Sequence, residues 1–95
     1  MENIINVNIG RVAFMLNNEA HNILEKYLNE LEEHYKNTTY GTEIMEDIES
    51  RIAELLLEKY SKDEVVDAQR IEEVILIMGQ PSDYFTSDSA PQEDD

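Results

Sequence analysis

Residues 5–16 alternate between apolar and other side chains on either side of the pair Gly10-Arg11. The alternating apolar residues are Ile5, Val7, Ile9, Val12, Phe14 and Leu16. A period of two is typical of β-strands, and glycine at the first central position suits a type II′ turn. Pairing the two strands about this turn places these six residues on one face, beginning with Ile9 opposite Val12. The other face carries Asn6, Asn8, Ala13 and Met15. Because a lone hairpin is only marginally stable in water, this face must pack against the rest of the chain.

Three later stretches carry apolar residues at every third or fourth position, which is the pattern of an amphipathic helix. They cover approximately residues 18–35, 42–60 and 67–78. Residue types that favour helix N-caps stand at their beginnings, namely Asn17-Asn18, Thr42 and Asp67. Gly79 followed by Pro81 ends the third stretch, because glycine suits the end of a helix and proline prevents its continuation.

The order of these elements predicts an α+β, mostly helical domain, in which an N-terminal β-hairpin packs on three helices (ββααα). The first two helices have similar lengths and a short connection, so we expect them to pack antiparallel. Val65-Val66 predicts a short extended piece that covers the edge of the core. We assign residues 1–85 to this domain. Residues 86–95 are rich in Ser, Asp, Pro and Glu, which predicts a disordered acidic tail or linker.

The chain of 95 residues contains 22 acidic and 7 basic residues, which give a net charge of -15. A surface of this charge repels DNA and anionic lipid headgroups, so we expect no nucleic acid partner and no direct membrane contact. High negative charge also favours solubility, and its more specific interpretation is a basic protein partner. The absence of cysteine suits a reducing cytoplasm.

The polar residues form no recognisable catalytic or metal-binding motif. His21 and His34 are thirteen residues apart, and no Glu-x-x-His motif accompanies the carboxylates. Neither a Gly-x-Ser-x-Gly sequence nor a glycine-rich phosphate loop occurs. We therefore predict that the chain is not an enzyme and uses no metal or cofactor. The alternative is a metal-dependent enzyme built on the carboxylate clusters, which titration with metal ions would test.

Asp47, Arg51 and Glu54 are the candidate partner-binding residues. Asp47 lies four positions before Arg51 and Glu54 three positions after it, so a helix places all three on one face. A ladder of surface ion pairs is the ordinary explanation of this spacing. However, Arg51 is the only basic residue between Lys36 and Lys59. We therefore predict that this face, or the open edge of the hairpin, binds a protein partner, of which a second copy is one candidate.

Four blocks of the sequence carry a resemblance to a known family. They are Val7 through Phe14, Ala20 through Leu28, Glu46 through Leu55 with its run Asp-Ile-Glu-Ser-Arg-Ile-Ala-Glu-Leu, and Ile71 through Pro81 with its Met-Gly-Gln-Pro ending. Together they resemble the N-terminal region that precedes the PspC-type transmembrane module in Bacteroidetes membrane proteins. Those proteins are often labelled stress-responsive transcriptional regulators. The resemblance covers residues 5–85.

This resemblance implies a non-catalytic regulatory module at the cytoplasmic face of the inner membrane, tethered to transmembrane helices beyond residue 95. Taken literally, the family label gives an alternative, a DNA-binding regulator with a degenerate helix-turn-helix. The third predicted helix has one basic residue, Arg70, beside Glu72 and Glu73, whereas a recognition helix needs basic side chains to contact phosphate. The prediction is therefore a protein-interaction module of a PspC-type stress-response protein.

Overall fold

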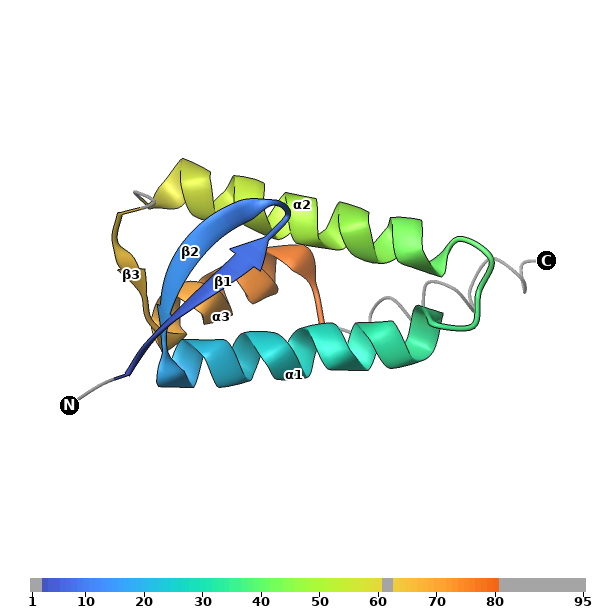
Figure 1. Cartoon of the computed structure of the whole chain (residues 1–95), viewed down its shortest axis with the longest axis horizontal. Coiled ribbons are helices and arrows are strands. Elements are labelled where there is room, and N and C mark those ends of the chain that lie inside the picture. Colours follow the sequence, from blue (N-terminus) through green and yellow to red (C-terminus); the bar gives the residue numbers. More distant parts are fainter. Residues whose placement is uncertain (1–2, 61–62, 81–95) are drawn as a thin grey trace.

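A computed structural model describes residues 3–60 and 63–80 of the chain (Figure 1). Its elements in chain order are β1 (Ile4–Ile9), β2 (Val12–Asn17), α1 (Asn18–Tyr35), α2 (Gly41–Lys59), β3 (Val65–Val66) and α3 (Ala68–Met78). The predicted α+β arrangement of a hairpin followed by three helices is confirmed. The predicted acidic tail and the last residues of the predicted domain, 81–85, lie outside the described residues.

The antiparallel register of β1 and β2 is the predicted one, with Ile9 opposite Val12 beside the turn and Ile5 opposite Leu16 at the far end. The predicted turn type is wrong. Gly10 and Arg11 both have positive φ angles, of 57° and 72°, which define a type I′ turn, whereas type II′ needs only the first. The type I′ twist matches that of the strands, so Arg11 adopts a left-handed conformation that non-glycine residues rarely use.

The two-residue strand β3 turns the hairpin into a three-stranded sheet with the order β1-β2-β3. Val65 and Val66 pair in parallel with Met15 and Leu16 of β2. Parallel neighbours require a long crossover connection, and α1 and α2 together provide it. The sequence predicted an extended segment here, but the structure shows that it is a strand of the sheet.

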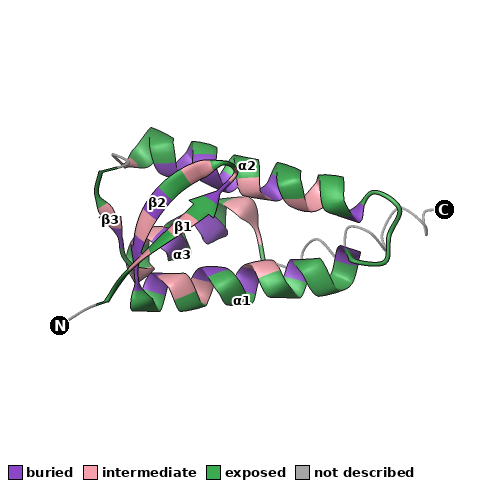
Figure 2. Ribbon diagram, viewed as in Figure 1, coloured by how far each residue is buried: buried purple, intermediate pink, exposed green. Residues whose placement is uncertain are grey.

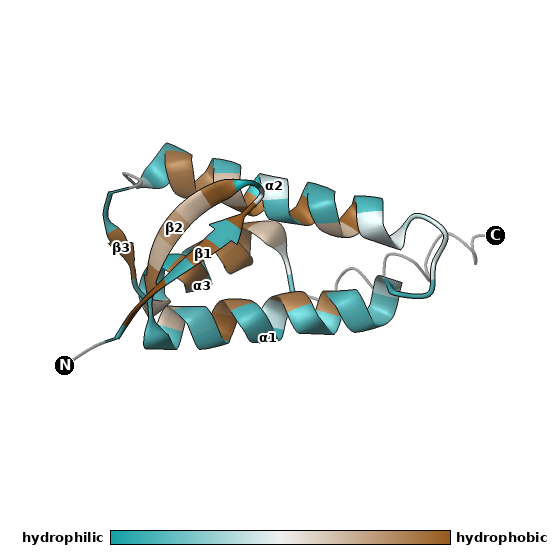
Figure 3. Ribbon diagram, viewed as in Figure 1, coloured by the Kyte–Doolittle hydropathy of each residue, from teal (hydrophilic) through white to brown (hydrophobic). Residues whose placement is uncertain are grey.

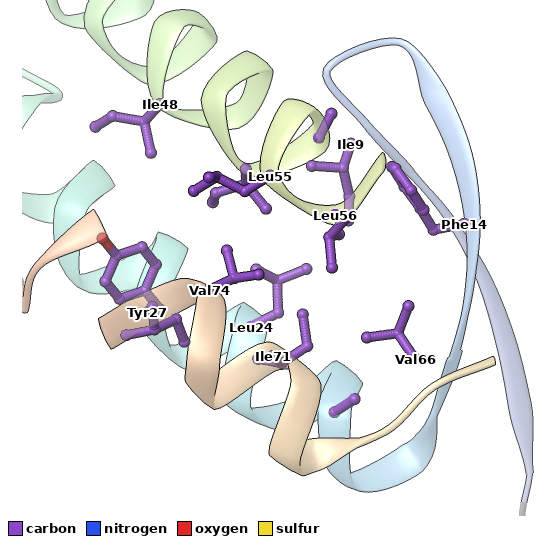
Figure 4. Packing of buried hydrophobic residues seen from close by; sticks show 14 of the residues in the cluster. Ile9, Phe14, Leu24, Tyr27, Ile48, Leu55, Leu56, Val66, Ile71 and Val74 are labelled. Carbon is purple, nitrogen blue, oxygen red and sulfur yellow. The ribbon is translucent and has the colours of Figure 1, made fainter. Parts of the chain in front are cut away.

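The hairpin crosses one side of the antiparallel pair formed by α1 and α2, and α3 lies on the other side (Figure 1). Buried and hydrophobic residues line the inward sides of all these elements (Figures 2 and 3). The largest fully buried side chains come from every element: Ile9, Leu16, Leu31, Ile52, Leu56, Val66, Ile71 and Val74. Figure 4 labels Ile9, Leu56, Val66, Ile71 and Val74 among the packed core residues. Burial of each stabilises the fold by about 1.5–3 kcal/mol relative to exposure. No helix within the described ranges is long and apolar enough to cross a membrane.

Two of the three predicted helix caps are confirmed. The Asn17 side chain accepts a hydrogen bond from the Ala20 amide at 2.9 Å, and the Asp67 side chain accepts one from the Arg70 amide at 3.0 Å. Each bond satisfies an amide that has no partner inside its helix, which stabilises the fold by about 1 kcal/mol.

The predicted cap at Thr42 is wrong, because α2 already begins at Gly41 and its N-cap, Tyr40, makes no side-chain capping bond. The connection between α1 and α2 is the reason. The Thr38 hydroxyl donates to the Tyr35 carbonyl at 2.8 Å, and a Cβ atom at Gly41 would lie only 2.0 Å from that same carbonyl oxygen. Because the end of α1 and the start of α2 approach each other so closely, the chain already adopts a helical conformation at Gly41, before Thr42.

Candidate partner-binding edge of the sheet

β1 forms one edge of the sheet and pairs, within the described residues, with β2 alone. In an antiparallel pair joined by a two-residue turn, every second residue directs its N–H and C=O away from the neighbouring strand. On β1 these residues are Ile4, Asn6 and Asn8, and the side chains of all three are exposed. Their backbone groups form a row that can pair with a further strand.

The hairpin strands are uncharged, although the chain has 22 acidic and 7 basic residues. Natural proteins protect edge strands from unwanted pairing with charged residues, proline or bulges. β1 has none of these devices, since it contains neither charge nor proline and its register with β2 is uninterrupted. The Ile4 side chain at its start is 47% exposed. The edge is therefore chemically suited to accept another strand.

A groove of about 490 Å³ lies between α1 and α2. Its apolar residues are Leu28 and Met45, both half-buried. Four glutamates and Lys36 also line it, the glutamates being Glu25, Glu32, Glu46 and Glu49. Glu49 connects the groove to the hairpin, because its carbonyl oxygen would lie 2.9 Å from a Cβ atom at Gly10. Glu49 thus lies both in the acidic groove and beside the turn at the end of β1.

The predicted partner-binding residues lie on a different face of α2. Arg51 forms an ion pair with Glu54 at 3.3 Å, and both side chains are more than half exposed. Asp47 is also exposed, but the ion pair of Arg51 is with Glu54. Such an exposed pair contributes between 0 and about 1 kcal/mol. Arg51 is two positions from Glu49, about 200° around the helix, so this face points away from the groove. A role of Asp47, Arg51 and Glu54 in binding stays a prediction.

Arg70 of α3 contacts the strand at the other edge of the sheet, β3. Its Nη1 atom donates to the Glu64 carboxylate at 3.2 Å and to the Val65 carbonyl at 3.3 Å. The guanidinium also lies 4.6 Å from the centre of the Tyr60 ring. These contacts connect the end of α2, β3 and α3, and they occupy a backbone acceptor of the β3 strand. Sequence reasoning treated Arg70 only as a candidate DNA contact.

The Tyr60 hydroxyl belongs to the same network and donates to the Glu73 carboxylate at 2.5 Å. This hydrogen bond raises the pKa of Tyr60 above its ordinary value of 10.0, and partial burial and the negative charge of Glu73 add to the effect. All three causes favour the neutral phenol over the phenolate. The network therefore joins α2 to α3 most firmly while Tyr60 keeps its proton.

The described residues show no arrangement suited to metal chemistry. No group of three or more His, Asp or Glu side chains in residues 3–60 and 63–80 is placed to hold a metal ion. His21 lies 3.4 Å from Glu25, and His34 packs edge-on against the Tyr35 ring with 4.7 Å between ring centres. The first contact is an i, i+4 pair of the kind common on helix surfaces, and the second joins two residues adjacent in the chain.

A second groove, of about 850 Å³, lies between α1 and α3. Ile23, Tyr27 and Leu76 contribute apolar surface to it, and the Leu76 side chain is 77% exposed. The Tyr27 hydroxyl donates to the Gly79 carbonyl at 2.7 Å and so joins α1 to the end of α3. Gln80, the last described residue, also lines the groove.

No protein-family model matches the chain, and no curated protein or solved structure is significantly similar to it. The resemblance to the region that precedes PspC-type modules therefore stays a prediction.

Proposed function

We propose that this chain is a non-catalytic protein-interaction module that binds an extended segment of another protein by strand addition at β1. The open and uncharged edge of β1, in a chain with a net charge of -15, is the observation that carries the proposal. In this mode of binding, backbone hydrogen bonds provide affinity and alternate side chains provide specificity. The module would serve as the cytoplasmic regulatory part of a PspC-type membrane stress-response protein, as the sequence resemblance implies.

The alternative of a DNA-binding regulator has less support. The basic residue of α3, Arg70, is engaged with Glu64 and Tyr60 rather than directed to solvent alone. Glu72 and Glu73 flank it with exposed negative charge. Phosphate contacts need several basic side chains on one surface, and α3 offers one.

Substitution of Asn6 tests the proposal. The Asn6 N–H faces the open edge, so Asn6→Pro removes an edge donor and adds a bulky ring without removing a hydrogen bond to β2. Asn6→Thr keeps the N–H and serves as the matched control. We expect wild type and Asn6→Thr to recover the same partners from the native host, and Asn6→Pro to lose them.

Urea unfolding of each variant must accompany this comparison, because a misfolded hairpin would also lose the partner. Equal recovery of the same partners by a folded Asn6→Pro variant would refute binding at β1. If Arg51→Glu instead abolishes recovery, the partner binds the outward face of α2 that carries Asp47, Arg51 and Glu54.

A further inference from the structure

We infer that the segment bound at β1 is a basic extended peptide, whose cationic side chains reach the glutamates of the groove between α1 and α2. This inference rests on the proposed strand addition and adds the chemistry of the partner. It is carried by two features, namely the open backbone edge of β1 and the acidic groove between α1 and α2, whose residue Glu49 lies against the hairpin turn at Gly10.

The geometry of a sheet determines where the side chains of an added strand point. Ile5, Val7 and Ile9 alternate along β1 on the face that packs toward the helices. A strand paired with β1 continues the same pleated sheet, so every second one of its side chains also points toward the helix layer. Figure 1 shows that the paired helices α1 and α2 extend well beyond the hairpin. The added strand would therefore direct these side chains toward the groove.

The residues of the groove define which side chains fit. Leu28 and Met45 offer apolar contact to the stem of a long side chain, and the surrounding carboxylates can accept hydrogen bonds from its charged end. Lys36, the one basic residue of the groove, already lies 3.2 Å from Glu33. Lysine and arginine combine an aliphatic stem with a cationic end, so they complement both parts of this surface.

A second copy of the chain fits this surface less well. Its β1 strand is uncharged and would bring no cation to the four glutamates of the groove. Two copies would also approach each other with a net charge of -15 each. Like charges of this size repel at low salt. The charge of the groove therefore favours a basic segment of a different protein.

Three blocked eight-residue peptides test the inference on the full chain. The first alternates lysine and valine, the second alternates glutamate and valine, and the third is the lysine peptide with N-methyl groups on alternate amides. Fluorescence anisotropy would measure their dissociation constants. We expect the lysine peptide to bind at least tenfold more tightly than either of the others. Its affinity should fall about tenfold between low and high salt, because salt screens charged contacts.

Two double variants with the same change of charge separate the groove from general attraction to an acidic protein. Glu46→Gln with Glu49→Gln neutralises two carboxylates of the groove. Asp47→Asn with Glu54→Gln neutralises two on the outward face of the same helix. We expect the groove variant to weaken binding of the lysine peptide at least fivefold, and the control variant to weaken it less than twofold.

The possible outcomes distinguish this inference from the proposed function. Equal weakening by the two double variants, or equal binding of the glutamate peptide, would overturn the inference of a basic segment. If no peptide binds while partner recovery still depends on Asn6, the inference fails and strand addition stands. Concentration-dependent dimerisation abolished by Asn6→Pro would identify a second copy as the occupant and would also overturn the inference.

Discussion

The two edges of the sheet differ in length, charge and protection. β3 has two residues, stands between the charged residues Glu64 and Asp67, and has its Val65 carbonyl bonded by Arg70. β1 has six residues, no charge, and a row of outward backbone groups with no such cover within the described residues. Short strands, charges and covering side chains are the usual protection against unwanted pairing.

This difference indicates that protection of the β1 edge was possible in this chain but was not used. The chain has 29 charged residues, yet the edge strand β1 contains none of them. Three charged residues lie near the opposite edge strand, β3. An unprotected edge is a hazard for aggregation unless it has a partner. The contrast between the edges therefore supports β1 as the binding strand, and three substitutions, each with a matched control, examine it.

Gly10→Ala should have the largest effect on stability, because it disturbs the packing of the hairpin turn against α2. The residue has a φ of +57°, and a Cβ atom there would lie 2.9 Å from both the Glu49 carbonyl oxygen and the Ser50 Cα atom. Left-handed strain and overpacking against backbone together should cost about 2–4 kcal/mol in the free energy of unfolding. Urea unfolding would measure the loss.

Arg11→Gly is the matched control at the turn. Arg11 also has a positive φ, of 72°, but its side chain is exposed. Glycine relieves the left-handed strain, so the variant should range from unchanged to about 1 kcal/mol more stable. If alanine at Gly10 is tolerated as well as glycine at Arg11, the contact between the hairpin turn and α2 does not position the edge.

Arg70→Met should open the β3 edge at a smaller cost. It removes the hydrogen bond to the Val65 carbonyl, the ion pair with Glu64 and the contact with the Tyr60 ring. Because the side chain is about one third exposed, solvent screening limits the expected loss to about 1 kcal/mol. Hydrogen exchange of the Val66 amide should become faster, since β3 loses an anchor.

Arg51→Met provides the comparison for that variant. It removes an exposed ion pair with Glu54 and no contact with the sheet, so we expect a change within about 0.5 kcal/mol. Equal losses from the two arginine variants would mean that Arg70 does not protect the edge.

The smallest effect should appear at alkaline pH. The hydrogen bond to Glu73 raises the pKa of Tyr60 in the folded chain above 10.0, so the unfolded chain loses this proton first as the pH rises. The stability contributed by Tyr60 is therefore complete below about pH 10 and declines above it. The difference in unfolding free energy between wild type and Tyr60→Phe should shrink between pH 9 and pH 11.

Tyr40→Phe is the matched control, because it removes the hydroxyl of a tyrosine that is 66% exposed. A difference between wild type and Tyr60→Phe that stays constant from pH 9 to pH 11 would contradict the proposed coupling of Tyr60 to Glu73.

The sequence by itself determined the elements of this protein and the register of its hairpin. Strand and helix periods are local properties of neighbouring residues, so the alternation around Gly10-Arg11 and the caps at Asn17 and Asp67 could be recognised without a structure. The lack of charge in residues 4–9 was equally visible, although its meaning depended on that strand lying at an edge.

Only the tertiary structure decided how these elements meet. Three features join residues that are distant in the chain or placed by packing: the parallel pairing of Val65-Val66 with β2, the start of α2 at Gly41 and the hydrogen bond from Arg70 to β3. The close approach of Gly10 to the backbone of α2 at Glu49 is of the same kind. Such contacts depend on the relative positions of whole elements, and local patterns of side chains do not specify those positions.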